Sequence, residues 1–245
     1  MVLEQLENTI NQGKKKLALL IDPDKTFGNK LTQMALDATK FDVDFIFYGG
    51  SLINNAHFAN EILRIKEFTK IPIVLFPGSN MQVSDNADAI LFLSLLSSRN
   101  PEYLIGQQVV AAPFVRNSNL ESISTAYLLV DGGRITTAHY MSNSLPIPSD
   151  KPEIAINTAI AAELMGFKCI YLDAGSGAMS PVPEDLIYAV KQNVSIPLIV
   201  GGGINTPEKL NLAYNAGADV AVIGTSIEND PSLLKDFAKI VKSFA

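Results

Sequence analysis

The chain has 245 residues, of which 47% are hydrophobic and 18% are charged. This apolar share is enough for a sizeable core, and the charged share is too low for a disordered chain. The net charge of −6 leaves no basic excess to neutralise phosphates, which argues against a nucleic-acid partner. The single cysteine, Cys169, excludes an internal disulfide and a cysteine-cluster metal site, and we expect it to be a buried core thiol.

No stretch of the sequence has the pattern of a membrane span or a targeting signal. A helix that crosses a bilayer needs about 20 consecutive apolar residues, and no apolar run approaches that length. The first residues also lack the charged and apolar regions of a signal peptide. We therefore expect a soluble cytoplasmic protein without an integral membrane segment.

The first half of the chain alternates short apolar runs with segments patterned as helices. A polar helix is predicted over 2–12, and the apolar runs after it have the length of buried parallel strands. Strands are predicted at 16–21, 45–48, 73–76 and 89–93, and helices at 29–39, 56–68 and 101–110. Residues 79–88, between the third and fourth strands, are too few for an ordinary helix. A loop or a single turn is therefore predicted there.

The second half continues the alternation around one irregular stretch. Strands are predicted at 126–130, 168–173, 197–200 and 219–223, and helices at 152–165, after Pro183, at 206–216 and at 231–244. Residues 134–150 contain Pro146 and Pro148 and are predicted to form a long loop, usually a functional or disordered feature. Eight strands alternating with helices imply an α/β fold, a closed (β/α)₈ TIM barrel, formed by residues 1–245 as one domain. A doubly wound open sheet is the alternative.

Two strands that end in glycine near the C-terminus predict a phosphate site. Residues 197–205 and 219–225 each begin as an apolar strand, and the glycines in question are Gly202, Gly203 and Gly224, followed by Thr225. Glycine lets a ligand approach backbone N–H groups closely, and the start of a following helix favours an anion. In TIM barrels the loops after the last two strands often hold phosphate. Plain tight turns are the alternative for these residues.

The ends of other predicted strands are also small or polar. In a barrel the carboxyl ends of the strands share the face that carries the active site. These residues are Asp22, Asp24 and Lys25 after the first strand, Gly49, Gly50 and Ser51 after the second, and Asp173, Gly175, Ser176 and Gly177 after the sixth. We therefore expect them to meet the glycine-ended strands at one end of the barrel.

Several of these residues are suited to chemistry. Asp22 and Ser51 offer the hard oxygen ligands that Mg²⁺ prefers, although Asp22 could instead be a turn or capping residue. Lys25 is either a counter-charge for phosphate or a solvated surface lysine. Asp173 ends a strongly apolar strand, where an unused carboxylate is costly, so a functional role is favoured. Neither His57 nor His139 has a recognisable nucleophile beside it, so a histidine mechanism is not predicted.

Five motifs in order resemble the geranylgeranylglyceryl phosphate synthase family. They lie at 20–25, 49–51, 146–155, 171–178 and 200–204. Together they cover most of the chain, and their order and spacing are more specific than any one of them. The family includes archaeal ether-lipid enzymes and bacterial relatives, and the long middle segment looks like the archaeal-type branch.

The resemblance implies a modified TIM barrel that lacks a regular third helix. It also implies a Mg²⁺-dependent prenyltransferase that moves a geranylgeranyl group from geranylgeranyl diphosphate to the C3 hydroxyl of sn-glycerol 1-phosphate, in ether-lipid biosynthesis. By similarity to the family, Asp22 and Ser51 would bind Mg²⁺. An allylic diphosphate leaves when its charge is neutralised, so Mg²⁺ at Asp22, together with Lys25, would stabilise this leaving group. The residues implied to bind glycerol 1-phosphate are Tyr171, Leu172, Asp173, Ala174, Gly175, Ser176, Gly177, Gly202, Gly203, Gly224 and Thr225. A homo-oligomer and transient membrane contact are also expected.

Asp173 is the expected catalytic carboxylate. It would orient the glycerol hydroxyl and accept its proton as the carbon–oxygen bond forms. The family commonly has Glu at this position, and Asp is one methylene shorter, so acceptance through a water molecule and a purely orienting role both stay open. The prenyl chain needs an apolar groove, for which Phe76, Phe92 and Tyr127 are candidates, with ordinary barrel packing as the alternative.

Two other classes of function fit the residues. One is another phosphate-binding barrel, such as an isomerase or aldolase that acts on a sugar phosphate. A Schiff-base aldolase would need a lysine near the site, and Lys168 begins the sixth strand at the opposite end. The other is a non-catalytic barrel that binds a phosphometabolite or a lipid, which would have no need for Asp22 and Asp173.

Overall fold

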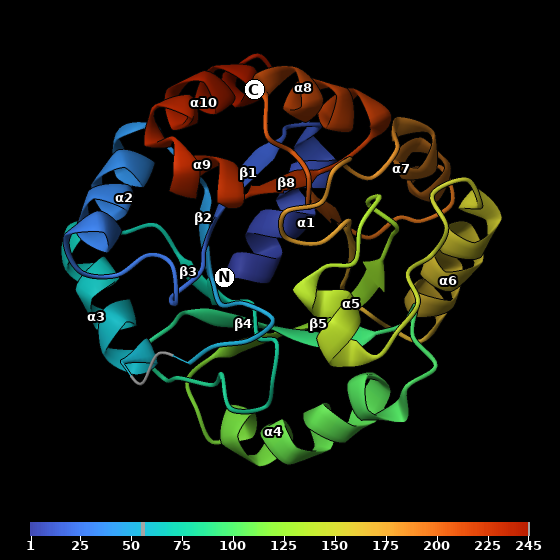
Figure 1. Cartoon of the computed structure of the whole chain (residues 1–245), viewed down its shortest axis with the longest axis horizontal. Helices are drawn as coiled ribbons and strands as arrows, with labels where there is room; N and C mark the ends of the chain where they lie inside the picture. The colour runs from blue at the N-terminus through green and yellow to red at the C-terminus, as the bar shows by residue number, and fades with distance from the viewer. Residues whose placement is uncertain (55–56, 245) are drawn as a thin grey trace.

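Eight parallel strands close into a barrel (Figure 1). The computed structural model describes residues 1–54 and 57–244. In chain order the strands are β1 (Lys16–Ile21), β2 (Phe45–Tyr48), β3 (Ile73–Leu75), β4 (Ala89–Leu95), β5 (Glu121–Leu129), β6 (Cys169–Asp173), β7 (Leu198–Gly201) and β8 (Val220–Ile223). Each strand pairs with its neighbours in sequence, and β1 also pairs with β8. The predicted barrel is confirmed, and the open sheet was the wrong alternative.

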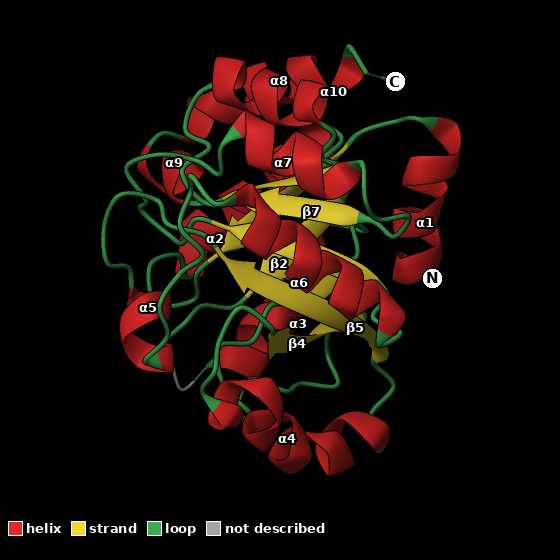
Figure 2. Cartoon of the chain, turned by 90° about the vertical axis from the view of Figure 1, so that its right-hand side faces the viewer, coloured by secondary structure: helices red, strands yellow, loops and turns green. Residues whose placement is uncertain are grey.

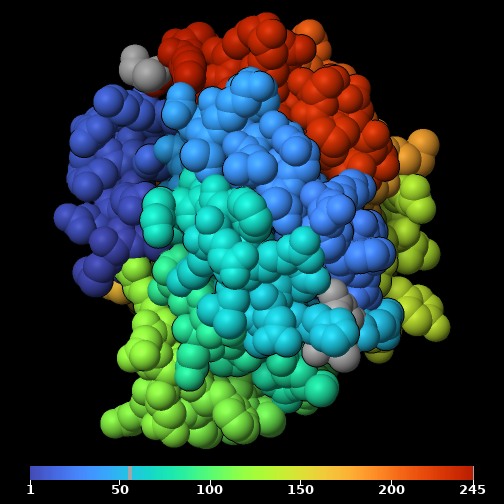
Figure 3. Space-filling view, turned by 90° about the vertical axis from the view of Figure 1, so that its left-hand side faces the viewer, coloured from blue at the N-terminus to red at the C-terminus, as the bar shows by residue number. Residues whose placement is uncertain are grey.

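Helices surround the barrel and bury the outer face of its strands (Figure 1). The outer helices are α2 (Gly28–Lys40), α3 (Phe58–Phe68), α4 (Gln107–Arg116), α6 (Pro152–Leu164), α7 (Glu184–Lys191), α8 (Pro207–Ala216) and α10 (Leu234–Lys242). Figure 3 shows the packed surface over α2 and α3. Because both faces of the strands are covered, continuous apolar runs form them, and every residue of β2 and β7 is buried. None of the helices in the described residues has the length and apolarity of a membrane span.

The helix α1 (Val2–Gln12) closes the amino-terminal end of the barrel. Val2 and Leu6 belong to the apolar cluster inside the barrel. Glu121, the first residue of β5, accepts hydrogen bonds from the backbone N–H groups of Val2 and Leu3, which fixes the start of α1. Figure 2 shows α1 on the opposite side of the barrel from the short helices α5 (Thr137–Ser142) and α9 (Thr225–Asn229). The carboxyl end of the strands is therefore the end where a site can form.

The helix that follows the third strand in a regular barrel is absent, as predicted. Residues 76–88, all of which the structure describes, contain no helix between β3 and β4. The Gln82 side chain accepts a hydrogen bond from the Gly78 N–H and donates one to the Gly50 carbonyl, at 3.0 Å each. These bonds hold the irregular segment against the loop that follows β2.

Four elements differ from the sequence prediction. The stretch 134–150, predicted as a loop, contains α5, and α9 was not predicted at all. The fifth strand begins at Glu121 instead of residue 126, because its polar first residues pair with β4. The helix predicted at 101–110 is a π-helical turn, Glu102–Gly106, followed by α4. Ala56, the predicted start of the next helix after β2, lies outside the described residues.

We predict that Leu6→Ala lowers the free energy of unfolding by about 2–5 kcal/mol. The Leu6 side chain is almost fully buried inside the barrel, so the substitution leaves a cavity where α1 closes it. Urea denaturation followed by circular dichroism measures the change. Leu164→Ala is the control, because that side chain is exposed and its loss is expected to cost less than about 0.5 kcal/mol. Equal losses in the two variants would contradict the closing role of α1.

Candidate active site

A cleft at the carboxyl end of the strands brings together most of the predicted site residues. It has a volume of about 570 Å³ and is lined by loops from widely separated parts of the chain. The predicted residues that line it are Asp22, Lys25, Ser51, Tyr171, Asp173, Ser176, Gly177, Gly202, Gly203, Gly224 and Thr225. The parallel barrel places these residues at one rim, as expected from their positions after the strands.

Three residues of the implied glycerol-phosphate set do not line the cleft. Leu172 and Ala174 pack in the apolar cluster between the barrel and the helices, because alternate residues along the chain face away from the cleft. Gly175 directs its N–H toward Asp173, and a Cβ atom built on it would lie 2.5 Å from the hydroxyl of Thr136. These three residues can reach a ligand only through their backbone.

Asp173 is buried at the end of β6 and accepts hydrogen bonds from two donors. The Tyr127 hydroxyl donates to Oδ2 at 2.6 Å, and the Gly175 N–H donates to Oδ1 at 2.7 Å. Burial raises the pKa of the Asp173 carboxyl, although both hydrogen bonds oppose the rise. Burial and the nearby carboxylate also raise the pKa of Tyr127 well above its usual value, so its hydroxyl stays a donor. A buried carboxylate at a cleft with a raised pKa has the properties of a proton acceptor.

Aromatic rings form the floor of the cleft beside Asp173. Tyr171 stacks on Phe76 with 5.1 Å between the ring centroids, and Tyr127 meets Tyr171 edge-on at 5.5 Å. Offset-stacked and edge-on contacts are the preferred geometries for aromatic pairs. The rings therefore pack against Tyr127, whose hydroxyl bonds to the carboxylate.

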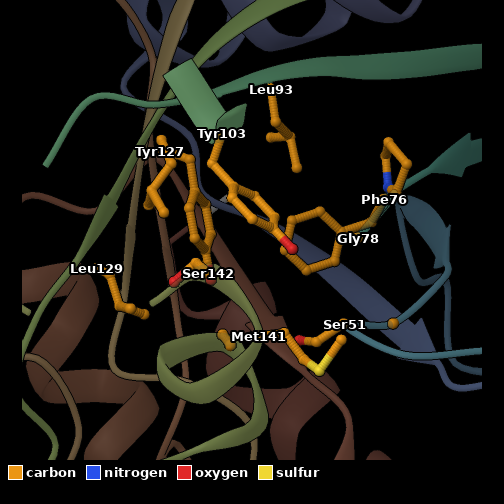
Figure 4. A pocket seen from close by; sticks show the side chains of 13 residues that line it. Ser51, Phe76, Gly78, Leu93, Tyr103, Tyr127, Leu129, Met141 and Ser142 are labelled. Atoms are coloured by element: carbon orange, nitrogen blue, oxygen red, sulfur yellow. The ribbon is translucent and has the colours of Figure 1, made fainter. Parts of the chain in front are cut away.

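An apolar cavity of about 70 Å³ adjoins the cleft (Figure 4). Leu93, Tyr103 and Met141 are among its lining residues, and none of the described residues that line it is charged. The cavity and the cleft share Gly50, Ser51, Phe76, Tyr127 and Ala138. Of the candidates for a prenyl groove, Phe76 and Tyr127 lie here. Phe92 instead packs against the outer apolar cluster and lines a separate pocket beside α4, so its part in a prenyl groove stays a prediction.

Asp22, Lys25 and Glu228 form an ion-pair cluster on the opposite side of the cleft. The Lys25 Nζ lies 2.7 Å from Asp22 Oδ2 and 3.8 Å from Glu228 Oε2. Glu228 also accepts a hydrogen bond from the Asp22 backbone N–H at 3.3 Å. Burial raises the pKa of Glu228, and the charge of Lys25 partly offsets this rise. Burial by itself lowers the pKa of Lys25, but the bond to Asp22 and the charge of Glu228 give a net rise.

Glu228 was missed by the sequence interpretation. It lies on α9, a helix of five residues that no periodic pattern could reveal. The one signal in the sequence was the position of a carboxylate four residues after Gly224, the glycine that follows β8. Its neighbours Ile227 and Asn229 form no recognisable motif with it. Its ionic role depends on contacts with Asp22 and Lys25, which are about 200 residues away along the chain.

Asp22 and Ser51 offer oxygen ligands at the same side of the cleft. A Cβ atom built on Gly50 would lie 3.6 Å from both carboxylate oxygens of Asp22, so the loop after β2 closely approaches this side chain. Within residues 1–54 and 57–244, no three His, Cys, Asp or Glu side chains gather as a complete metal site. Mg²⁺ does not need one, because it keeps several waters and takes one or two protein oxygens together with substrate phosphates. This set of donors fits Mg²⁺ alongside a diphosphate.

The glycine loops after β6, β7 and β8 form the remaining side. Gly202 and Gly203 have φ values of 78° and 69°, in the left-handed region that favours glycine. A Cβ atom on Gly202 would lie 2.6 Å from Asp173 Oδ1. The hydroxyls of Ser176 and Thr225 lie 3.2 Å apart and join two of the loops. Lys25 is the one Lys or Arg among the described residues that line the cleft, so hydroxyls and backbone N–H groups would hold an anion here.

A family model, that of the PcrB family, matches residues 10–242. The chain belongs to the PcrB family. A relative named geranylgeranylglyceryl phosphate synthase, from Chitinophaga pinensis, is 50% identical over 234 residues, which cover 96% of this chain and 93% of that protein. A relative of the same name from Spirosoma linguale is 44% identical over 232 residues, which cover 95% and 93% of the two chains. The resemblance inferred from the five motifs is confirmed.

A solved structure of this PcrB-type fold is also similar over its whole length. It is the crystal structure of (S)-3-O-geranylgeranylglyceryl phosphate synthase from Thermoplasma acidophilum in complex with the substrate sn-glycerol-1-phosphate. The TM-score is 0.93 at 37% sequence identity, and the match covers 99% of each chain. The fold of this chain is thus shared, over nearly its whole length, with an enzyme solved with its substrate.

We predict that Tyr127→Phe raises the pKa of Asp173 further. The Tyr127 hydroxyl donates to the carboxylate and so favours its ionised form, and removing this donor favours the protonated form. Carbon NMR of labelled aspartate carboxyl groups measures the titration, with Asp173→Asn to assign the signal. Tyr188→Phe, at an exposed tyrosine, is expected to leave that titration unchanged. A lower or equal pKa in Tyr127→Phe would contradict the assignment of this hydrogen bond.

Proposed function

We propose that this protein transfers a geranylgeranyl group from geranylgeranyl diphosphate to the C3 hydroxyl of sn-glycerol 1-phosphate and releases diphosphate. The names of its relatives in the PcrB family and the substrate in the related crystal structure support the proposal. One observation in the structure carries it furthest. Tyr127, which donates to the buried carboxylate of Asp173, lines both the polar cleft and the apolar cavity, so this carboxylate lies beside the place where the two meet.

The glycine loops would position glycerol 1-phosphate. Ser176 and Thr225 would present their hydroxyls to the phosphate. The left-handed turns at Gly202 and Gly203 pack the loop after β7 closely against the backbone of the loop after β6, where a side chain would not fit. The glycerol end of the molecule would then extend toward Asp173. Holding the nucleophile in this way supplies much of the rate enhancement in a group transfer.

Asp173 would act as the general base. It accepts the proton of the C3 hydroxyl while that oxygen bonds to C1 of the prenyl group and the bond from C1 to the diphosphate oxygen breaks. The hydrogen bonds from Tyr127 and Gly175 hold the carboxylate in one orientation. Its raised pKa makes it a stronger base than an exposed aspartate.

The apolar cavity would receive the part of the prenyl chain next to the reacting carbon. Its lining by Phe76, Leu93 and Tyr103 excludes water from the part of the chain next to the reacting carbon (Figure 4). An enzyme that acted only on a sugar phosphate would have no use for such a cavity beside its carboxylate. This favours prenyl transfer over the sugar-phosphate alternative.

Mg²⁺ is the proposed cofactor, held by Asp22 and Ser51 together with the diphosphate. When bound there it would neutralise negative charge on the leaving group. Asp22 is also the ion-pair partner of Lys25, so this carboxylate would serve both cations. Glu228 lies within reach of the Lys25 ammonium group and gives it a second partner, which keeps this positive charge beside the diphosphate.

The homo-oligomer expected from the resemblance stays a prediction. The outer surface around α4 carries exposed apolar side chains that a second copy could cover, among them Ile105, Val109 and Phe114. Cytoplasmic localisation likewise stays a prediction.

We predict an organic-soluble product when the purified protein is incubated with radiolabelled sn-glycerol 1-phosphate, Mg²⁺ and geranylgeranyl diphosphate. Asp173→Asn is expected to lower turnover by about 10²–10⁴-fold, because the amide cannot accept the proton. Calorimetry should show that this variant still binds sn-glycerol 1-phosphate. Asp150→Asn, at an exposed aspartate, is the control for loss of one carboxylate. Failure to form product with prenyl diphosphates of any length would overturn the proposed function.

We predict that Asp22→Asn raises the Mg²⁺ concentration needed for half-maximal activity and lowers turnover. An amide oxygen carries no net charge and is a weaker ligand for Mg²⁺ than a carboxylate. Titration of activity with Mg²⁺ measures both effects, and Asp185→Asn, on the exposed side of α7, should titrate like the original protein. An unchanged titration in Asp22→Asn would rule out Asp22 as a metal ligand.

A further inference from the structure

Exposed apolar side chains cluster around α5 at the open end of the barrel. Ile135 is 78% exposed, Tyr140 is 81% exposed and Leu145 is 88% exposed. Met179, 70% exposed, lies beside Gly133, two residues before Ile135, and its N–H donates to the Gly132 carbonyl. We call these four residues the α5 patch. Such a concentration of large apolar side chains on a protein surface usually marks a site of interaction.

The opposite face of α5 covers the apolar cavity. Ala138, Met141 and Ser142 line that cavity, and Figure 4 shows Met141 and Ser142 at its edge. The helix is fixed at its start, where the Thr136 N–H donates to Nδ1 of His139 at 2.9 Å. A helix that only covered a cavity would present polar residues to water on its outer face. Here the outer side of α5 exposes Tyr140, and the exposed Ile135 and Leu145 flank the helix.

We propose that the α5 patch docks on the surface of a lipid bilayer. This role of the patch rests on the proposed function, because a geranylgeranyl chain and the lipid product both partition into membranes. Docking through the patch would place the bilayer beside the helix that covers the apolar cavity. The prenyl chain could then pass between bilayer and cavity around α5 with little exposure to water, which is unfavourable for apolar chains.

The position of the patch suits docking on a flat surface. Figure 2 shows α5 at the outer edge of the open end, on the side of the barrel away from α1. In Figure 3, yellow-green atoms of the segment that includes α5 project at the right edge, and α1 lies at the left edge in dark blue. The closed end of the barrel would therefore face away from the membrane.

The charges around the patch favour insertion of apolar side chains over electrostatic attraction. Each exposed basic residue near the patch in the sequence has an exposed acidic residue close to it. Arg134 follows Asp131, and Lys151 follows Asp150. The chain as a whole has a net charge of −6. Binding would therefore depend on Ile135 and Leu145 entering the acyl region and on Tyr140 at the interface, where tyrosine is favoured. Anionic lipids are not required, and added salt should not release the protein.

Flotation with lipid vesicles tests the proposal. The full-length protein is mixed with vesicles of phosphatidylcholine, or of phosphatidylcholine and phosphatidylglycerol in equal parts, at low and high salt. We expect it to float with both kinds at both salt concentrations. The double variant Ile135→Ser/Leu145→Ser should partition about tenfold more weakly, because two inserting side chains are lost. The control Leu164→Ser/Met165→Ser removes two exposed apolar side chains at the end of α6 and should float like the original protein.

Activity measurements separate failure of docking from failure of the proposed function. With a short, water-soluble prenyl diphosphate, the double variant should keep the original turnover, since neither residue lines the cleft or the cavity. Absence of vesicle binding by the original protein, or equal binding by the double variant, would overturn docking even if the enzyme is active. Dissociation of an oligomer by the double variant in ultracentrifugation would also overturn it, because the patch would then be an interface between copies. Flotation that depends on the patch supports docking even if no prenyl transfer is found.

Discussion

Closure of the parallel ladder between β1 and β8 is the constraint on which the site depends. Ala18 pairs with Phe45 of β2 on one side and with Val222 of β8 on the other. Because all strands then run in the same direction, every carboxyl end reaches one rim, and segments from residue 22 to residue 228 meet there. The other end is filled by α1, so the chemistry has a single open face.

The buried carboxylate of Asp173 is compatible with this fold because the register of β5 and β6 supplies a partner. Tyr127 lies directly opposite Tyr171, and Leu129 lies opposite Asp173. The Tyr127 hydroxyl therefore reaches diagonally to a residue two positions further along the neighbouring strand, a distance that an aromatic side chain can span. Without this donor and the Gly175 N–H, the charged form would be strongly destabilised by burial.

The rim is divided into three regions of different character. The loops after β6, β7 and β8 supply glycine and hydroxyl groups, and the loops after β1 and β2, together with α9, supply charge and oxygen ligands. The apolar region lies on the side of β4, β5 and α5. The irregular segment between β3 and β4 contributes Pro77 and Gly78 to the apolar cavity. The absence of a regular helix after β3 therefore helps to form the space proposed for the prenyl chain.

The sequence by itself determined the barrel and much of its polar rim. Continuous apolar runs suit strands that are buried on both faces, and polar or glycine residues directly after such strands indicated Asp22, Ser51 and the glycine loops. Only the tertiary structure decided the ends of β5, the existence of α5 and α9, the ionic role of Glu228 and the pairing of Tyr127 with Asp173. The physical reason is that periodicity records which side of a segment is buried. Short helices, polar strand ends and side-chain partners are stabilised by contacts between distant segments, and these contacts exist only once the register is set and the barrel is closed.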